Sequence, residues 1–385
     1  MPTSPLRALV VSSSRTRGVL AAARALGGSG WTVGIGTPDD GGMVAASRWC
    51  SRHHHVPRPR GDCREFIDGV RAAIRDGGYE VVFGGGDDWA AALGMYADEL
   101  DAHVAHPAAD VMMRALDKEE LVARAKANGL ATPHTVHADD AAMAHWTGPV
   151  FVKCRTHWFP GQEHRERIEA RAFADIDAAS AQVRQLRDAG FDVVLQAPIA
   201  GRLSALIGLF DGTRLRGRVQ QTTFGSWPTP AGPSARAETE PVDEYLVEGV
   251  EAMLADIGWQ GLVEVQFVTP AGGLPHVIDL NGRFYGSMAL AIGAGVNLPD
   301  AWGRQVLGLP LPDLPDGEPG VRYVWGAGDL RRAVTERRGG LARDVASSVG
   351  WLLGPSVTSV FDVRDPAPTM HLVTARLRRA VDTTQ

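Results

Sequence analysis

The alternation of hydrophobic and polar positions is clearest between residues 259 and 299. Leu262–Thr269 alternates and is rich in β-forming residues, Pro270–Gly273 is typical of a turn, and Leu274–Asn281 alternates again. This pattern predicts a β-hairpin. We expect the rest of the chain to be organised around it.

The predicted hairpin carries oxygen-bearing side chains on one face. If the four-residue turn sets the register, Glu264 lies opposite Asp279 and Gln266 lies opposite Val277. Side chains alternate between the two faces of a strand, so Glu264, Gln266, Asp279 and Asn281 are expected to share a face. Carboxylate and amide oxygens suit a hard cation such as Mg²⁺, which also binds nucleotide phosphates.

Arg283 comes two residues after the hairpin. Its guanidinium group is suited to holding a phosphoryl or carboxylate group. On spacing alone, a hairpin with one solvated polar face explains the pattern equally well.

The first part of the chain has the pattern of an α/β fold. Residues 6–11 are typical of a buried strand, a helix is predicted after the polar loop 12–17, and residues 32–37 form a second strand. This is a β-α-β unit with a parallel sheet. A further strand is predicted within residues 79–89, ending in a Gly-Asp loop. The first turn has no G-x-G-x-x-G sequence, which argues against a nicotinamide cofactor there.

Ligands of such sheets bind at the carboxyl ends of the strands. Ser14, Arg15, Asp87 and Asp88 are therefore candidate substrate contacts, although helix caps and turns are the commoner role for such residues. The run 53–55 of three histidines alternates between faces in an extended strand, which favours a polar strand over a metal site.

The middle of the chain holds all three of its lysines, on one predicted helix and one predicted strand. A helix is expected from Lys118 to Ala127, and a short strand at 148–155 carries Lys153. The basic residues around Pro160 predict a loop: Arg155, His157, Arg165 and Arg167. A strand at 193–196 ends in Gln196.

A second hairpin is predicted from residue 206 onward, turning at Asp211 and Gly212. Arg214, Arg216, Arg218 and Gln220 alternate onto one of its faces. Residues 222–240, rich in Thr, Pro, Gly and Ser, are expected to form a long loop over an acceptor site.

The composition narrows the class of protein. The chain has 385 residues, 44% hydrophobic and 22% charged, as in ordinary globular proteins. Its net charge of −6 argues against nucleic acid as the main partner. Three scattered cysteines give no metal or disulfide pattern, and no apolar run is long enough to span a membrane. A cytoplasmic location fits.

Several motifs in this order resemble the ATP-grasp superfamily. Asp279-Leu-Asn281-Gly-Arg283 is similar to its E-x-N-P-R signature, with Asp for Glu and Gly for Pro, and Gly286–Pro299 resembles the segment after that signature. Val265-Gln266-Phe267 is similar to the partner strand of carbamoyl phosphate synthetases. Asp117-Lys118 with Gly129–Pro133 resembles the pattern that opens the domain. The N-terminal strand pattern and the tail also resemble the branch of carboxylate–amine ligases that includes D-aspartate ligases.

The resemblance implies a role for each matching residue. Gln266, Asp279 and Asn281 would bind Mg²⁺, with Mn²⁺ and Glu264 open as alternatives for metal and ligand. Lys118 and Lys153 would contact the ATP phosphates, while Gln196 and the backbone of Ala197 and Ile199 would hold adenine. Arg283 would contact the phosphates or an acyl phosphate, and Arg218 would receive phosphate and substrate carboxylate. The basic loop would cover the phosphates.

The implied fold has a Rossmann-like pre-ATP-grasp domain at 1–105 and an ATP-grasp domain at 106–310. Two α+β subdomains of the latter clamp the nucleotide, one of them a lid at about 134–197, and residues 311–385 complete the domain. The implied reaction is ATP-dependent ligation of a small carboxylate to an amine through an acyl phosphate, releasing ADP. A non-amine acceptor (bicarbonate, thiol or hydroxyl), a module that has lost catalysis, and a homodimer stay open.

Overall fold

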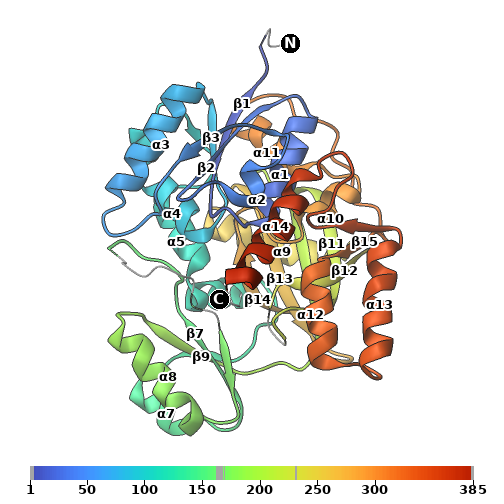
Figure 1. The fold of residues 1–385 in the computed structure, drawn as a ribbon. Coiled ribbons are helices and arrows are strands. Elements are labelled where there is room, and N and C mark those ends of the chain that lie inside the picture. Colours follow the sequence, from blue (N-terminus) through green and yellow to red (C-terminus); the bar gives the residue numbers. More distant parts are fainter. Residues whose placement is uncertain (1–3, 162–167, 169, 230–231, 383–385) are drawn as a thin grey trace.

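The computed structural model describes residues 4–161, 168, 170–229 and 232–382 (Figure 1). The strands in these residues form three sheets of five, four and seven strands. The predicted residues Arg165 and Arg167 of the basic loop lie outside the described residues.

The five-stranded sheet is parallel, with strand order β3-β2-β1-β4-β5. Alternate residues of β1 pack on different helices: Ala8 and Val10 belong to the core that α1 buries, and Leu9 and Val11 to the core that α3 buries. A strand covered on both faces is continuously apolar, which explains its sequence. The elements of this part are β1 (Arg7–Val11), α1 (Arg17–Gly28), β2 (Thr32–Thr37), α2 (Gly42–Ala45), β3 (Cys50–His55), α3 (Arg64–Gly77), β4 (Val81–Gly84), α4 (Asp87–Met95) and β5 (His103–Val104).

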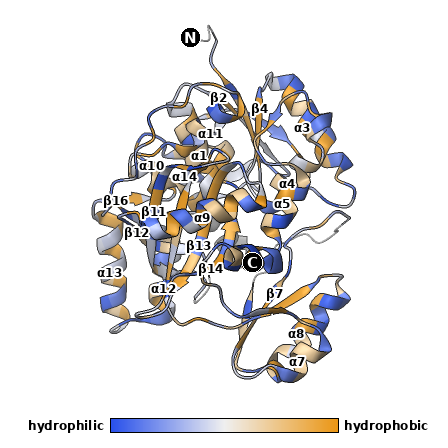
Figure 2. Cartoon of the chain, turned by 180° about the vertical axis from the view of Figure 1, so that it is seen from behind, coloured by the Kyte–Doolittle hydropathy of each residue, from blue (hydrophilic) through white to orange (hydrophobic). Residues whose placement is uncertain are grey.

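The hydropathy of the elements follows their burial. Along α3, hydrophobic and polar residues alternate with the helical period, and its apolar residues form its buried face (Figure 2). Two helices lead out of the five-stranded sheet, α5 (Ala109–Leu116) and α6 (Lys118–Ala127), the second with the bounds predicted from the sequence.

The four-stranded sheet has the order β6-β9-β7-β8, and its neighbouring strands are antiparallel. Two helices lie along one of its sides (Figure 1). Val150, Val152 and Cys154 pack against α8, so Lys153, between two of them, is on the other face. The elements are β6 (Thr135–His137), α7 (Asp140–His145), β7 (Val150–Cys154), β8 (Arg171–Phe173), α8 (Ile176–Asp188) and β9 (Val193–Gln196).

The seven-stranded sheet has the order β14-β13-β10-β11-β12-β15-β16. One face packs on α9 and α6, and the other on α1, α10 and α11. Its elements are β10 (Arg202–Phe210), β11 (Leu215–Ser226), β12 (Ser234–Glu240), α9 (Glu244–Ile257), β13 (Gly261–Thr269), β14 (His276–Asn281), α10 (Met288–Gly293), α11 (Leu298–Val306), β15 (Arg322–Val324), α12 (Gly326–Glu336), α13 (Leu341–Leu353), β16 (Ser356–Thr358) and the C-terminal α14 (Ala367–Asp382).

The hairpin of β13 and β14 forms, but the predicted register is wrong by two residues. Glu264 pairs with Asn281 and Gln266 with Asp279, and the register then shifts before Phe267 pairs with Val277. The connection between the strands runs through residues 270–275, longer than the predicted four-residue turn, and the irregularity adds one residue to β14.

The prediction of a long loop over residues 222–240 is also wrong. β11 continues to Ser226 and β12 occupies Ser234–Glu240, paired antiparallel with β11. Ser226 and Ser234 are register partners across the two strands, and the hydroxyl oxygens of Thr223 and Ser234 are 2.6 Å apart. No described helix is both long and apolar enough to cross a membrane.

Candidate functional site

The four predicted side chains do share one face of the hairpin. Glu264 and Asn281 are direct register partners, as are Gln266 and Asp279, so the two pairs lie side by side on β13 and β14. The error in register therefore changes which residues are opposite each other and leaves the face intact. This face is the one turned toward α1, α10 and α11.

Glu264 is the most deeply buried of the four, with 3% of its surface exposed. Its Oε2 atom accepts hydrogen bonds from Gln266 Nε2 at 3.1 Å and from Asn281 Nδ2 at 2.9 Å. Burial raises the pKa of this carboxyl to about 7. Glu264 thus bonds to the two amides, a contact that its place in the strand pattern does not reveal.

Asp279 forms an ion pair with Lys118, whose Nζ donates to Asp279 Oδ1. Lys118 is 3% exposed and begins α6, where Asp117 caps the helix by accepting from the N–H groups of Glu119 and Glu120. A buried ammonium group requires an anionic partner. The resemblance implies that Lys118 contacts the ATP phosphates and that Asp279 binds the metal ion. The structure brings these two residues into contact.

Arg155 joins the four-stranded sheet to α6. Its guanidinium group donates to Asp117 at 2.8 Å and lies 3.1 Å from Glu119, and its backbone carbonyl accepts from Lys118 N–H. The sequence predicts Arg155 in a loop covering the phosphates. Instead it pairs with two carboxylates at the end of β7, because the cap of α6 lies directly beside that strand.

Arg283 connects the hairpin to the five-stranded sheet. Its Nε donates to Asp87 Oδ1 at 2.7 Å, and its Nη2 donates to Asn281 Oδ1 at 2.8 Å. Asp87 is the first residue of α4, after the carboxyl end of β4. Of the four candidate substrate contacts in the N-terminal part, Asp87 is bonded to a residue of the candidate site, Arg283.

The other three N-terminal candidates have different surroundings. Ser14 is buried and donates to Asp39 at 2.7 Å, while Arg15 is exposed. Burial, and then the charge of Asp87, raise the pKa of Asp88 to about 6. The histidine run is a polar strand, as predicted: His54 is hydrogen-bonded to a tyrosine hydroxyl and its neighbours alternate in direction.

Sequence reasoning misses Arg17, the first residue of α1. Its guanidinium carbon lies 3.8 Å from the centre of the Trp325 ring, and Nη1 donates to Tyr323 Oη at 3.1 Å. The Tyr323 hydroxyl in turn donates to the carbonyl of Gly286, three residues after Arg283. The partners are more than 300 residues away in sequence, so no local pattern points to this contact.

Lys153 and Gln196 meet on the face of the four-stranded sheet opposite its helices. Lys153 Nζ donates to Gln196 Oε1 at 2.6 Å, and Gln196 Nε2 donates to Thr135 Oγ1 at 2.9 Å. The N–H of Ala197 donates to the carbonyl of His134, so a contact from Ala197 to a base would be made by its carbonyl oxygen. Ile199 lies in the connection between β9 and β10.

The structure does not bring Arg218 to this group. Its guanidinium donates to Asp316 at 2.6 and 2.8 Å and to Glu244 at 2.7 Å. The next residue, Val219, belongs to the face of Glu264, since both are register partners of one residue in β10. Arg218 therefore points to the opposite face of the sheet. The predicted role in receiving substrate does not fit this position.

Gly282, which stands where the signature has Pro, lies against Trp259. A Cβ atom at this position would be 2.1 Å from Trp259 Cη2, far closer than atoms approach in proteins. Glycine, which replaces the proline of the signature, therefore leaves space for the large buried ring of Trp259. No local pattern in the sequence indicates this contact.

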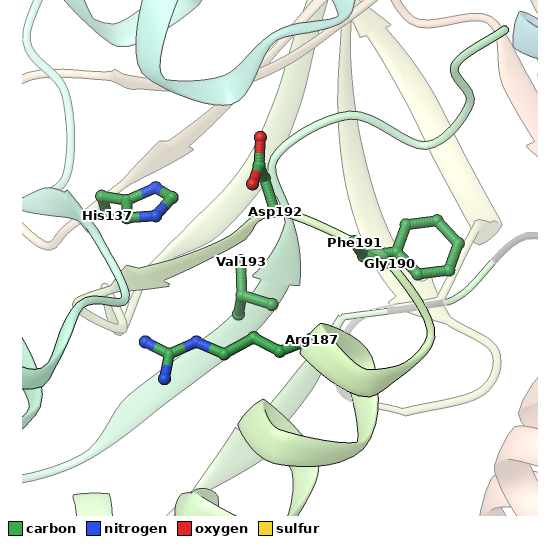
Figure 3. Close-up of a pocket in the computed structure, with 6 residues that line it drawn as sticks. All are labelled: His137, Arg187, Gly190, Phe191, Asp192 and Val193. Carbon is green, nitrogen blue, oxygen red and sulfur yellow. The ribbon is translucent and has the colours of Figure 1, made fainter.

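A surface pocket of about 350 Å³ lies beside the start of β9 (Figure 3). It is lined by His137, Arg187, Gly190, Phe191, Asp192 and Val193. His137 enters from β6 and Arg187 from the end of α8 (Figure 3). None of the predicted site residues lines it.

The donor set fits a hard divalent cation. Among the described residues no three His, Cys, Asp or Glu side chains form a metal cluster, so the candidate ligands are one carboxylate and two amides. Because Gln266 and Asn281 turn their nitrogens to Glu264, their oxygens point elsewhere. Asp279 and two amide oxygens are the ligand type that Mg²⁺ prefers.

One family model matches part of the chain. A family model described as ATP-grasp in the biosynthetic pathway with Ter operon matches residues 234–328, which span β12, β13, β14 and β15. A sequence comparison with curated proteins found no match. The matched segment contains Glu264, Gln266, Asp279, Asn281 and Arg283.

Solved structures with the same fold cover most of the chain. The L-amino acid ligase from Bacillus licheniformis is 15% identical, with a TM-score of 0.60 over 79% of this chain and 75% of that one. N5-carboxyaminoimidazole synthetase from Staphylococcus aureus, complexed with ADP, is 12% identical, with 0.61 over 83% and 81%. The biotin carboxylase domain of the Hydrogenobacter thermophilus 2-oxoglutarate carboxylase, with MgADP and bicarbonate, is 13% identical, with 0.62 over 82% and 73%.

The family match over residues 234–328 and the shared fold both support the resemblance to the ATP-grasp superfamily. The resemblance inferred from the sequence is confirmed, as is the α/β fold with an N-terminal parallel sheet preceding the ATP-grasp fold.

Proposed function

We propose that this chain is an ATP-dependent ligase that joins a small carboxylate to an amine through an acyl phosphate. The observation that carries the proposal is the contact between Lys118, at the start of α6, and Asp279, on the hairpin. A cation and a carboxylate at this point are the groups needed for a nucleotide phosphate and its metal ion.

In this proposal Asp279, Gln266 and Asn281 hold magnesium, and Lys118 and Lys153 contact the phosphates of ATP. Bound magnesium supplies positive charge that offsets the charge of the phosphate groups. In the ligand-free protein Lys118 and Asp279 neutralise each other. The nucleotide phosphates would replace Asp279 as the partner of Lys118, and the metal ion would replace Lys118 as the partner of Asp279. Each charge therefore keeps a partner of opposite sign.

Lys153 and Gln196 are proposed to meet the nucleotide from the four-stranded sheet, with the backbone of Ala197 and Ile199 beside adenine. Lys153 projects from the sheet face opposite the helices, where its Nζ donates to Gln196. The proposal leaves out Arg218, which has carboxylate partners on the other face of the seven-stranded sheet.

Arg283 is proposed to stabilise the charge that develops on the acyl phosphate. A carboxylate oxygen attacks the γ-phosphorus, the bond to the β-phosphate oxygen breaks, and ADP leaves. The amine nitrogen then attacks the acyl carbon, loses a proton, and phosphate leaves with the carboxylate oxygen. Catalysis by positioning and charge needs no protein nucleophile. Asp87, bonded to Arg283, holds the guanidinium in place.

The identity of the acceptor that attacks the acyl phosphate is an open choice within this proposal. Similar folds occur in a ligase of amino acids and in a carboxylase crystallised with bicarbonate. The amine acceptor is proposed from the resemblance to carboxylate–amine ligases. Asp87, at the start of α4, is already paired with Arg283, so its charge does not decide between the two acceptors.

The test is product analysis with an ¹⁸O-labelled carboxylate panel, amino acids as amines, ATP and Mg²⁺. We expect ADP, an amide product by mass spectrometry, and one ¹⁸O atom in the released phosphate. Asp279→Asn, which removes the ligand charge, should give neither product. ADP formation that depends on bicarbonate and transfers no label from the carboxylate would overturn the amine ligase in favour of a carboxylase.

A further inference from the structure

Glu264 occupies the middle of the metal-facing side of the hairpin. It is the register partner of Asn281 on one neighbouring strand and of Ile207 on the other, and Gln266 lies two residues further along its own strand. Both Gln266 and Asn281 are therefore within reach of one carboxylate. At 3% exposed, Glu264 has little access to solvent.

The hydrogen bonds of Glu264 determine how both amides are turned. Gln266 Nε2 and Asn281 Nδ2 each donate to Glu264 Oε2, at 3.1 and 2.9 Å. An ionised carboxylate only accepts hydrogen bonds, so an amide beside it must present its nitrogen. The orientation follows from this chemistry, even though the nitrogen and oxygen of an amide are nearly identical in shape.

The consequence for a cation is direct. A hard metal ion binds the oxygen of an amide and is repelled by its NH₂ group. With the nitrogens held by Glu264, the oxygens face away from it, and Asn281 Oδ1 accepts from Arg283 Nη2 at 2.8 Å. Without Glu264 the Gln266 amide loses the bond that fixes it and can turn its NH₂ group toward the metal, while Asn281 keeps one of its two orienting bonds, the one to Arg283.

Glu264 itself is poorly placed to be a ligand. One of its oxygens already accepts two hydrogen bonds, and the side chain is more deeply buried than Asp279, whose side chain is 17% exposed. Oxygen atoms that orient ligands without touching the metal are a recurrent feature of metal sites.

We infer that Glu264 is a positioning residue that orients the amide oxygens of Gln266 and Asn281 toward the metal ion and does not bind the ion itself. The inference rests on the proposed function, because it concerns the proposed magnesium site. It assigns Glu264 a role different from that of the ligands.

The experiment measures Mn²⁺ affinity by electron paramagnetic resonance in the presence of ADP, with no turnover required. We expect Glu264→Met to raise the Mn²⁺ dissociation constant about ten- to a hundredfold, as loss of an orienting partner does. Glu264→Gln, whose amide oxygen still accepts from both neighbours, should stay within about threefold of the wild-type value. Asp279→Asn should lose far more Mn²⁺ affinity than Glu264→Gln.

A second comparison separates orientation from simple loss of charge. In a Gln266→Leu background one of the two amides is gone. The rise in the Mn²⁺ dissociation constant caused by Glu264→Met should therefore be at least about threefold smaller than in the wild-type protein. The same fold-change in both backgrounds would mean a pure charge effect and would overturn the inference. An unchanged Mn²⁺ affinity in Glu264→Met, or an equal loss in Glu264→Gln and Asp279→Asn, would also overturn it.

The matched control is Gln221→Leu, because Gln221 is equally buried (3% exposed) and bonds to Ser287. It should leave Mn²⁺ affinity unchanged. ADP affinity in EDTA and the melting temperature report whether each variant folds, and Glu264→Asp, too short to reach both amides, replaces Glu264→Met if that variant does not fold. Absence of Mn²⁺–ADP binding in the wild-type protein would count against the proposed function, whereas normal wild-type binding with unaffected variants would count against Glu264 alone.

Discussion

Arg283 Nε donates to Asp87 Oδ1 across 2.7 Å, which links the hairpin of the seven-stranded sheet to the first turn of α4. The two side chains are 14% and 9% exposed. Removing one partner of a buried ion pair leaves the other charge uncompensated. The contact between the two sheets is thus expected to matter for stability as well as for catalysis.

We predict that Asp87→Ala lowers the free energy of unfolding by about 3 kcal/mol, since the buried guanidinium loses its carboxylate. Asp87→Asn keeps an accepting oxygen and should cost less. Urea denaturation followed by circular dichroism measures both. The control is Asp101→Asn, at an exposed position. Equal stability of Asp87→Ala and the wild-type protein would contradict an important contact here.

Much of the fold is predictable because local patterns report it. The continuous apolar run of β1, the helical spacing of α3 and the start of α6 each depend on residues close in sequence. The register of β13 and β14 is not predictable in this way. It depends on a connection longer than the predicted turn and on an irregularity in β14, and neither has a distinct residue signature.

The alternation of side chains along a strand predicts which residues of the candidate site share a face of the sheet. Glu264 and Gln266 are two residues apart, so their common face follows from the sequence. Their roles do not, because burial of Glu264 and its bonds to two amides depend on the packing of α1 and α10 against the sheet. The position of Arg218 is not predictable, because nothing local indicates that Asp316 and Glu244 lie beside it.

We predict that Gly282→Ala destabilises the protein by about 1–3 kcal/mol, because the added methyl group overlaps the Trp259 ring. The expected measurement is the midpoint of urea unfolding. Gly28→Ala is the matched control: its Cβ meets no atom within 4 Å, and its stability should be equal or slightly higher. A neutral Gly282→Ala would show that Trp259 moves aside without cost.

We predict a loss of stability below neutral pH from His106. Its Nε2 accepts from the N–H of Gly84 at 2.7 Å, and burial lowers the pKa of the ring to about 4. The unfolded chain binds a proton near pH 6.5, so stability from this group is complete above that pH and is lost as the pH falls toward 4. Between about pH 7.5 and 5.0 the loss is about 2 kcal/mol.

The check compares the wild-type protein with His106→Gln, which keeps an accepting atom but does not titrate. The free energy of unfolding should fall by about 2 kcal/mol more in the wild-type protein over this pH range. Glu264 and Asp88, whose raised pKa values act in the opposite direction, are common to both proteins. Parallel curves would contradict the prediction.

The central claim is that Lys153 contacts the phosphates of ATP, and isothermal titration with a non-hydrolysable ATP analogue and Mg²⁺ tests it most directly. Lys153→Met keeps the apolar stem and removes the charge, so the dissociation constant should rise about ten- to a hundredfold, which corresponds to about 1.5–3 kcal/mol. Lys126→Met, at an exposed position of α6, is the control and should bind as the wild-type protein does. Unchanged affinity in Lys153→Met, or no binding by the wild-type protein, would contradict the account.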